Sequence, residues 1–209
     1  KSGFVEIETG GDFIRLCSVV IQDGKIVVGG TTVSGQLVLA RYDLLGQIDE
    51  QFGVDGFAFL ATTDGSLKMS QLILQADGKL VCAGGLKESM GMAMRFTADG
   101  HPDKEWNGGL PVFTNTGPET VWRSLAQQPD GKIVVVGNNR ALHIIAGRLL
   151  PNGDYDTRFG GTGSGWVSFG PSGGLPWDVK VQSGARIIVG GEAFIEMGNR
   201  GPVVYGLQA

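Results

Sequence analysis

Short apolar runs separated by turn residues recur along the whole chain. In the first part of the sequence these runs are Phe4–Glu8, Leu16–Ile21, Ile26–Val28 and Leu37–Tyr42. They are rich in Val, Ile, Leu and Phe, which favour strands, and they are bounded by Gly, Asp and Thr. The Asp-Gly pair at positions 23–24 predicts a hairpin between the second and third runs. Since no segment shows a sustained helical period of apolar residues with caps, the pattern predicts an all-β protein.

The runs repeat at a nearly constant spacing. Asp-Gly-Lys occurs three times, and its lysines, Lys25, Lys79 and Lys132, are 54 and 53 residues apart. The next copy opens at Arg186, another 54 residues along the chain. The repeats extend over approximately 1–54, 55–108, 109–163 and 164–209. Four strand-like runs in about 53 residues are typical of a propeller blade, so we expect one domain, a β-propeller of four four-stranded blades.

Two features of the pattern favour a ring that closes within the chain. The sequence opens on a first strand-like run, Gly3–Ile7, and Val203–Tyr205 falls near the end of a fourth strand of the last copy. That copy also lacks the Asp-x-x-Phe-Gly linker that leads from one repeat to the next. The alternative is half of a larger ring that a partner chain completes, so the pattern does not decide between a monomer and a dimer.

The repeat motif resembles a known bacterial repeat. Gln128–Gly137 reads QPDGKIVVVG, and it is followed by Ala146–Leu149 and by Asn152–Gly160, which reads NGDYDTRFG. This pattern resembles the delta-60 repeat over almost the whole chain, most closely in repeats one to three, while the fourth repeat departs from it at Ser183–Arg186. The resemblance implies a β-propeller, an extracellular or cell-envelope location in a bacterium, and no shared catalytic residues.

Composition narrows the class of protein. Hydrophobic residues make up 42% of the 209 residues, which argues against intrinsic disorder, and 36 glycines supply the turns. The net charge of −4 without a basic cluster argues against nucleic acid as a partner. No apolar run approaches the ~18 residues of a membrane-spanning helix. Cys17 and Cys82 lie on strand-like runs, where we expect buried free thiols, with a disulfide as the alternative.

An arginine and an aspartate recur as a pair in the first three repeats. The arginine ends an apolar stretch and the aspartate follows in the next turn. The pairs are Arg41 with Asp49, Arg95 with Asp103, and Arg148 with Asp156. Because the pair occurs in every complete repeat, we expect a structural clamp, in which the guanidinium binds the carboxylate of the turn, rather than a specific anion or metal site.

The sequence shows no recognisable catalytic constellation. Ser172 lies in a G-x-S-x-G match, but the strand and helix that a nucleophile elbow requires are missing around it. His101 and His143 have no ligand partners at the spacing of a zinc site. The oxygen-rich turn at 152–156 resembles a calcium loop, yet Asx turns explain it without metal. We therefore expect no enzyme activity and no cofactor, with calcium binding and a catalytic site in a central funnel as the alternatives.

Positions that vary while their surroundings repeat are the best candidates for binding. Arg15, Met69 and Trp122 lie ten residues before the repeat lysine, and Trp177 lies one residue out of step in the fourth copy. The full set of candidate binding residues is Arg15, Met69, Trp122, Arg123, Asn138, Asn139, Arg140, Trp177 and Asp178.

These candidates favour a non-enzymatic scaffold that binds a protein partner through one face of loops. The alternative is a glycan-binding propeller in which Trp122 and Trp177 stack on sugar rings. The two tryptophans are equally compatible with packing between blades, where they would have no role in binding.

Overall fold

The computed structural model describes residues 14–62, 66–87, 90–114, 120–139, 141–170, 172–196 and 199–208. Within them the chain forms strands and two short 3-10 turns, η1 (Asn107–Gly109) and η2 (Phe159–Gly161). The strands are β1 (Ile14–Gln22), β2 (Lys25–Thr32), β3 (Leu37–Tyr42), β4 (Phe57–Leu60), β5 (Leu67–Leu74), β6 (Leu80–Leu86), β7 (Met90–Phe96), β8 (Val112–Thr114), β9 (Val121–Gln127), β10 (Ile133–Asn138), β11 (Ile144–Leu149), β12 (Trp166–Phe169), β13 (Leu175–Val181), β14 (Ile187–Glu196) and β15 (Asn199–Leu207). The predicted all-β class is confirmed.

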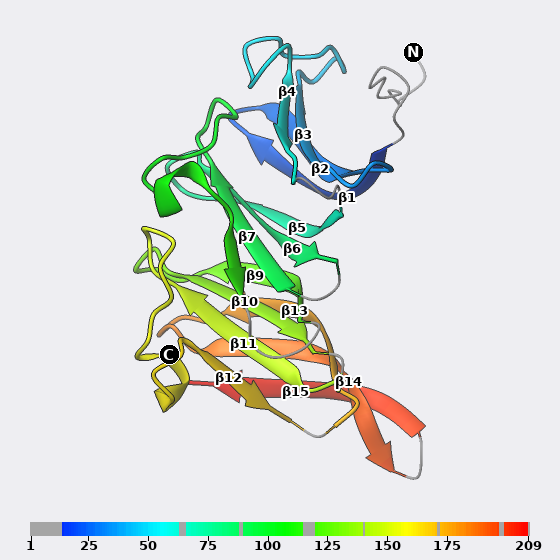
Figure 1. Ribbon diagram of the computed structural model, residues 1–209, viewed down its shortest axis with the longest axis vertical. Coiled ribbons are helices and arrows are strands. Elements are labelled where there is room, and N and C mark those ends of the chain that lie inside the picture. The colour runs from blue at the N-terminus through cyan, green and yellow to red at the C-terminus, as the bar shows by residue number, and fades with distance from the viewer. Residues whose placement is uncertain are drawn as a thin grey trace.

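The strands form four antiparallel sheets that follow one another along the chain (Figure 1). The first sheet has the order β1-β2-β3-β4, the second β5-β6-β7-β8 and the third β9-β10-β11-β12. The fourth sheet has three strands within the described residues, in the order β13-β14-β15. Four sheets of three or four antiparallel strands are consistent with a propeller.

The sheets do not coincide with the predicted repeats, because each is displaced by one strand. The run at 57–60, assigned by the repeat to the start of a blade, is the last strand of the preceding sheet. Its residues Phe57 and Phe59 lie opposite Ala40 and Val38 of β3. β8 and β12 close the second and third sheets in the same way. The period in the sequence gives the length of the unit, whereas the backbone pairing decides where each unit begins. Phe4–Glu8 lies outside the described residues.

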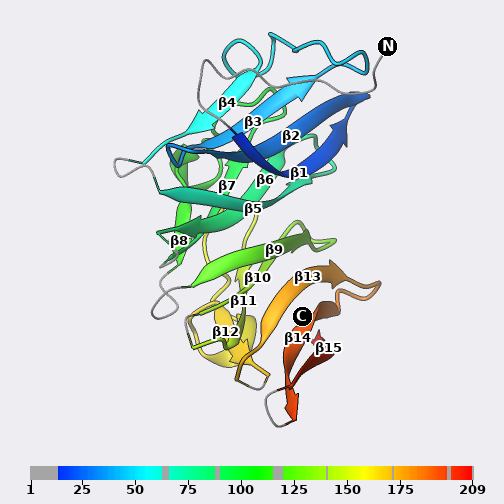
Figure 2. The same cartoon turned by 90° about the vertical axis from the view of Figure 1, so that its right-hand side faces the viewer.

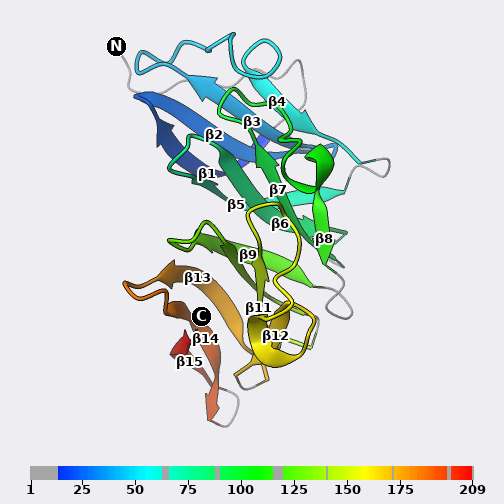
Figure 3. The same ribbon diagram turned by 90° about the vertical axis from the view of Figure 1, so that its left-hand side faces the viewer.

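The four sheets form an open arc, so the predicted closure within the chain is not observed. The first strands of successive sheets pack against one another, β1 against β5, β5 against β9 and β9 against β13. The views in Figures 2 and 3 place the first and fourth sheets at opposite ends of the molecule. Each sheet packs on the sheets that precede and follow it in the chain. After the fourth sheet the arc is still open (Figures 2 and 3).

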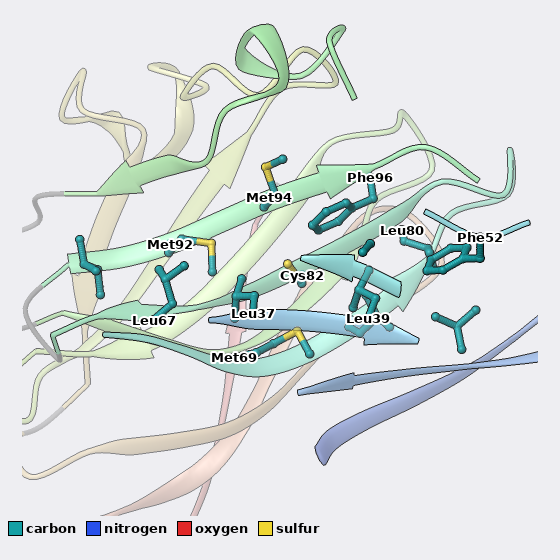
Figure 4. Packing of buried hydrophobic residues seen from close by; sticks show 14 residues of the cluster. Leu37, Leu39, Phe52, Leu67, Met69, Leu80, Cys82, Met92, Met94 and Phe96 are labelled. Atoms are coloured by element: carbon teal, nitrogen blue, oxygen red, sulfur yellow. The ribbon is translucent and has the colours of Figure 1, made fainter. Parts of the chain in front are cut away.

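Three apolar layers, one between each pair of neighbouring sheets, make up the core. Figure 4 shows the first layer, where Leu37 and Leu39 of the first sheet meet Met69, Cys82 and Met92 of the second. Trp106 and Trp122 fill the second layer and Phe159 the third. Because both faces of the second and third sheets are covered, their central strands β6 and β10 are buried along their whole length.

Candidate functional site

A β-bulge interrupts the first strand of every sheet. The pairing with the second strand skips one residue, and the skipped residues are Cys17, Ser70, Arg123 and Trp177. A bulge adds one unpaired residue to a strand and redirects the side chains around it. Trp177 is thus equivalent to Arg123 and not to Trp122. This explains why Trp177 lies one residue out of step with Trp122 when both are counted from the repeat lysine.

The glycine that recurs in each second strand is required by this bulge. Gly137 of β10 lies opposite Trp122, next to the bulge. A Cβ atom on Gly137 would lie 1.9 Å from the carbonyl oxygen of Val121, and one on Gly84 would lie 1.9 Å from that of Lys68. Such distances exclude any side chain, so the glycine is required by the close approach of the first strand.

The residue after the bulge links each sheet to the next. Ser18 Oγ accepts a hydrogen bond from the amide of Leu72 at 3.1 Å, and Gln71 Oε1 accepts one from the amide of Leu125 at 2.8 Å. Ser124 Oγ likewise accepts from the amide of Val179 at 3.1 Å. The bulge therefore points one polar side chain per sheet at the first strand of the following sheet.

A hollow of about 1030 Å³ lies where the bulged strands of the first three sheets begin. Residues from the starts of β1, β5 and β9, from the end of β10 and from the β2–β3 turn line it. Its polar lining includes the hydroxyl groups of Thr31 and Ser70 and the amides of Asn138 and Asn139. Its charged lining residues are all cationic: Arg15, Lys68, Lys87 and Arg123. Among the described residues the charged lining of the hollow is thus entirely cationic, although the whole chain is acidic.

Five of the predicted binding residues line this hollow together. They are Arg15, Met69, Arg123, Asn138 and Asn139. Met69 is 7% exposed and its side chain belongs to the first apolar layer, so it closes the floor of the hollow rather than offering a free surface. Arg140 lies outside the described residues. The sequence missed the cationic residues Lys68 and Lys87, which come from the β5 strand and from the turn after β6.

The two tryptophans proposed as a sugar platform have opposite environments. Trp122 is 0% exposed, and its ring lies against Gly91 of the second sheet. This burial corrects its assignment as a binding residue, since a covered ring cannot stack on a ligand. Trp177 is 56% exposed. The hypothesis that both Trp122 and Trp177 stack on sugar rings therefore does not hold for Trp122, because the two positions are not equivalent in the strand register.

Trp177, in the fourth sheet, contacts Arg123, a residue of the third sheet that lines the hollow. The guanidinium of Arg123 lies over the Trp177 ring, 5.4 Å from its centroid. Arg123 Nε also donates a hydrogen bond of 2.6 Å to Asn138 Oδ1, so the guanidinium is held between an amide and an aromatic face. Beside Trp177, Asp178 accepts a hydrogen bond from Ser124 Oγ at 3.0 Å and pairs with Lys180 at 2.9 Å.

The recurring arginine and aspartate form ion pairs in all three complete repeats. The Nε–Oδ2 distances are 2.6 Å for Arg41–Asp49, 2.7 Å for Arg95–Asp103 and 3.0 Å for Arg148–Asp156. The repeat lysine binds the same carboxylate, as in the 2.6 Å pair of Lys25 with Asp49. The hydrogen bond from Lys25, followed by the contacts of Arg41, holds the pKa of Asp49 below its usual value against the opposing effect of burial.

Each clamp arginine also packs on an aromatic ring, and two of them reach the next repeat. The ring is Phe52 for Arg41, Trp106 for Arg95 and Phe159 for Arg148, at 4.7, 5.0 and 4.7 Å from the centroids. Arg41 Nη1 donates to the carbonyl oxygen of Ala98 at 2.8 Å, and Arg95 Nη1 donates to that of Pro151 at 2.7 Å. These contacts are those of a structural clamp that joins neighbouring sheets.

One pair of potential catalytic groups comes together at the surface. His143 Nε2 lies 3.3 Å from Ser172 Oγ, in an exposed contact. Among the described residues no carboxylate contacts His143, so the pair lacks the third group that orients a catalytic histidine. His101 lies in the turn after β7. In the described part of the chain no three His, Cys, Asp or Glu residues cluster as metal ligands, and no helix is long and apolar enough to cross a membrane.

Both cysteines are free thiols. Full burial raises the pKa of Cys82 to about 12, and partial desolvation raises the pKa of Cys17 to about 11. Cys82 lies in the first apolar layer, whereas Cys17 is the bulged residue of β1 and is exposed. The expectation of a buried thiol thus holds for Cys82 and is wrong for Cys17.

Comparison with known proteins supports the architecture and adds no activity. Residues 21–52 and 128–159 match the family described as a domain of unknown function (DUF5122) beta-propeller. The chain therefore carries repeats of β-propeller type. No curated protein matches the chain.

A solved structure resembles the chain in fold. It is described as a protein of unknown function from Bacteroides caccae, and it shares 16% sequence identity with this chain at a TM-score of 0.54. The match covers 89% of this chain and 55% of that one. The chain therefore spans about half the length of this larger protein.

Proposed function

We propose that the chain is a non-enzymatic β-propeller scaffold that binds a protein partner through the hollow at the bulged strand starts. One observation carries the proposal: side chains chosen as binding candidates from the repeat pattern meet at one hollow whose charged lining residues are all cationic. A rigid layered core holds these strand ends in place, as is usual for binding loops on a scaffold. The cationic lining favours an acidic segment of the partner.

The sequence motif supports two further parts of the proposal, the type of repeat and the location of the protein. The motif QPDGKIVVVG at 128–137 supports a repeat of the delta-60 type. Repeats of this type occur mostly in surface or secreted bacterial proteins, which supports an extracellular or cell-envelope location. Glycan binding has weaker support than a protein partner, since only Trp177 of the two tryptophans offers an exposed ring.

A comparison of charge variants tests the proposed function. Wild-type chain, the double variant Arg15→Glu/Arg123→Glu and the control Lys104→Glu are each immobilised and exposed to lysate of the source organism. Lys104 is exposed in the turn after β7, at the opposite end of the strands from the hollow. A protein that binds wild type and the control but is lost from the double variant supports the proposal. A bound set that is identical for all three proteins overturns it.

A further inference from the structure

Four side-chain oxygens around the hollow accept hydrogen bonds from the chain itself. They belong to Thr31, Thr32, Asn138 and Asn139, and their donors are the amides of Met69 and Gln36, Arg123 Nε and the amide of His143, at 2.6–3.1 Å. The charged lining residues are all donors, because guanidinium and ammonium groups have no acceptor atom. The side chains of the hollow therefore offer a ligand more donors than acceptors.

Arg15, Thr31 and Ser70 form one group of donors, the first cluster. Arg15 of β1 lies directly opposite Thr31 of β2 in the register of the first sheet. Side chains of directly opposed residues lie on the same face of a sheet, with Cβ atoms about 5 Å apart. The Thr31 hydroxyl contacts the amide of Met69, which precedes Ser70 in β5. The guanidinium and the two hydroxyl groups thus come together from two sheets at the edge of one hollow.

The first cluster has the chemistry of a carboxylate site. Arg15 is exposed, and in the described part of the chain neither its guanidinium nor the Ser70 hydroxyl makes a hydrogen bond or an ion pair. A guanidinium presents its N–H groups as a planar fork that binds a carboxylate through two parallel hydrogen bonds. A hydroxyl beside it can donate to the same oxygen atoms. One carboxylate is therefore the ligand group that these donors fit best.

Arg123, Asn138 and Asn139 form the second cluster, in the third sheet. The Arg123 guanidinium lies over the Trp177 ring while its Nε donates to Asn138 Oδ1, so its plane is fixed by two contacts. Asn138 Nδ2 donates to the carbonyl oxygen of Asn139 at 3.0 Å, which links the two asparagines. The second cluster thus brings a positioned cation and the Asn139 side chain to the same hollow.

The distance between the clusters sets the size of a ligand that reaches both. They lie on the first and third sheets, and β5 of the second sheet packs between β1 and β9. Packed sheets stand about 10 Å apart, so the two backbones are separated by at most roughly 20 Å, which an extended chain covers in about six residues. The hollow of about 1030 Å³ is also at the upper limit of the roughly 300–1,000 Å³ of small-ligand pockets. An extended segment fits these dimensions better than a single small acid.

Taking the hollow as the partner site of the proposed function, we infer that it binds an extended acidic peptide segment with one carboxylate at the first cluster and another at the second. Ionised aspartate and glutamate side chains are acceptors only, which matches the excess of donors in the lining. Lys68 and Lys87 also line the hollow, and no carboxylate belongs to its described lining. The partner is thus defined by two acidic side chains within about six residues of extended chain.

Fluorescence anisotropy with a labelled peptide of eight glutamates tests this ligand class. The peptide is expected to bind wild type at one site, and a peptide of eight glutamines is expected to bind at least about tenfold more weakly. A labelled dipeptide of glutamate should also lose about tenfold or more, since it cannot reach both clusters. Equal binding of the three peptides overturns the assignment. Polyglucuronate, an acidic polysaccharide, overturns it if it binds as tightly as the glutamate peptide or more tightly.

Variants of Arg15 test the first cluster. Arg15→Gln is expected to weaken binding of the eight-glutamate peptide about tenfold with an unchanged circular dichroism spectrum, since the side chain is exposed. Arg15→Lys keeps the charge but not the fork and should recover part of this loss. The control Lys104→Gln removes one charge at the opposite end of the strands and should leave binding unchanged. A wild-type affinity for Arg15→Gln, or an equal loss in the control, overturns the first cluster as a carboxylate site.

The lysate experiment separates failure of the acidic ligand from failure of the proposed function. A partner that is captured by wild type, lost from Arg15→Glu/Arg123→Glu and displaced by the glutamate peptide supports both. A partner captured in the same way that the peptide neither displaces nor replaces retains the partner site and overturns the acidic segment. Absence of such a partner together with absence of peptide binding overturns both.

Discussion

Arg95 binds Asp103 of its own repeat through Nε at 2.7 Å, and both side chains are almost completely buried. The same guanidinium donates through Nη1 to the carbonyl oxygen of Pro151 in the following repeat. A single buried cation thus fixes the clamp turn of one sheet and its position against the next. Each sheet packs only on its neighbours, so no single core connects all four sheets. The clamp adds a polar contact between neighbouring sheets to the apolar layer that they share.

Replacing Arg95 by alanine is expected to destabilise the chain by about 3–5 kcal/mol. The substitution removes one of the two cations that bind the buried Asp103 carboxylate, leaving Lys79, and it removes the bond to Pro151. Urea unfolding followed by tryptophan fluorescence measures the loss. Arg158→Ala is the control, since Arg158 is exposed in a turn, and we expect it to change the free energy of unfolding by less than about 0.5 kcal/mol. Equal effects of the two substitutions would contradict a structural role for the clamp.

The clamp aspartates predict a loss of stability in acid. Burial alone would raise the pKa of Asp103, but bonds from the Glu105 amide, Lys79 and Arg95 outweigh it and lower the pKa in the folded state. A carboxyl group whose pKa is lower in the folded chain stabilises it above the unfolded pKa and loses that contribution as the pH falls through the folded pKa. The free energy of unfolding is therefore expected to decrease below about pH 4. Asp103→Asn should make this decrease shallower, and an unchanged pH profile would refute the assignment.

Gly137 and Gly190 are expected to respond in opposite ways to alanine. A Cβ on Gly137 meets the Val121 carbonyl at 1.9 Å, whereas one on Gly190 meets nothing within 4 Å. We expect Gly137→Ala to cost at least about 1–3 kcal/mol through backbone displacement. Gly190→Ala should be neutral or stabilising by up to about 1 kcal/mol, because alanine loses less backbone entropy in a strand. The urea concentration at half-unfolding, measured for wild type and both variants at the same low protein concentration, tests both expectations.

Alanine variants of Trp122 and Trp177 are expected to differ in their free energy of unfolding. Trp122→Ala opens a cavity in the second apolar layer and is expected to cost about 3–5 kcal/mol. Trp177→Ala removes an exposed ring and its contact with Arg123, for which we expect a loss below about 1 kcal/mol. Guanidinium unfolding monitored by circular dichroism gives both values. A large loss for Trp177→Ala would show that this ring is part of the core.

The free cysteines are expected to differ in reactivity with a thiol reagent. Exposed Cys17 should react in the native protein, at a rate that rises with pH up to its pKa of about 11. Cys82 is 0% exposed and should react only after unfolding. Mass spectrometry of the alkylated peptides counts each site. Modification of Cys82 in the native state would indicate local opening of the first apolar layer.

The sequence alone determined the period and type of structure. Alternating runs rich in Val, Ile and Leu, with Asp-Gly turns every 53–54 residues, specify strands and hairpins through local backbone preferences. The Arg–Asp clamp was also predictable, because a pair that recurs in every complete repeat is required by the repeat itself. Arg15 was found from its variation against this regular background, and Arg123, Asn138 and Asn139 were added as polar residues near such positions.

Tertiary structure decided what depends on pairing between distant segments. The outer strand of each of the first three sheets comes from the following repeat, and the first and fourth sheets lie at opposite ends of the arc (Figure 2). Neither fact is encoded in the period of the repeat. The environments of Trp122 and Trp177 depend on the bulge, which moves one ring into the interface between sheets and leaves the other exposed. A one-residue displacement in a strand changes which face a side chain occupies, and only the observed register settles it.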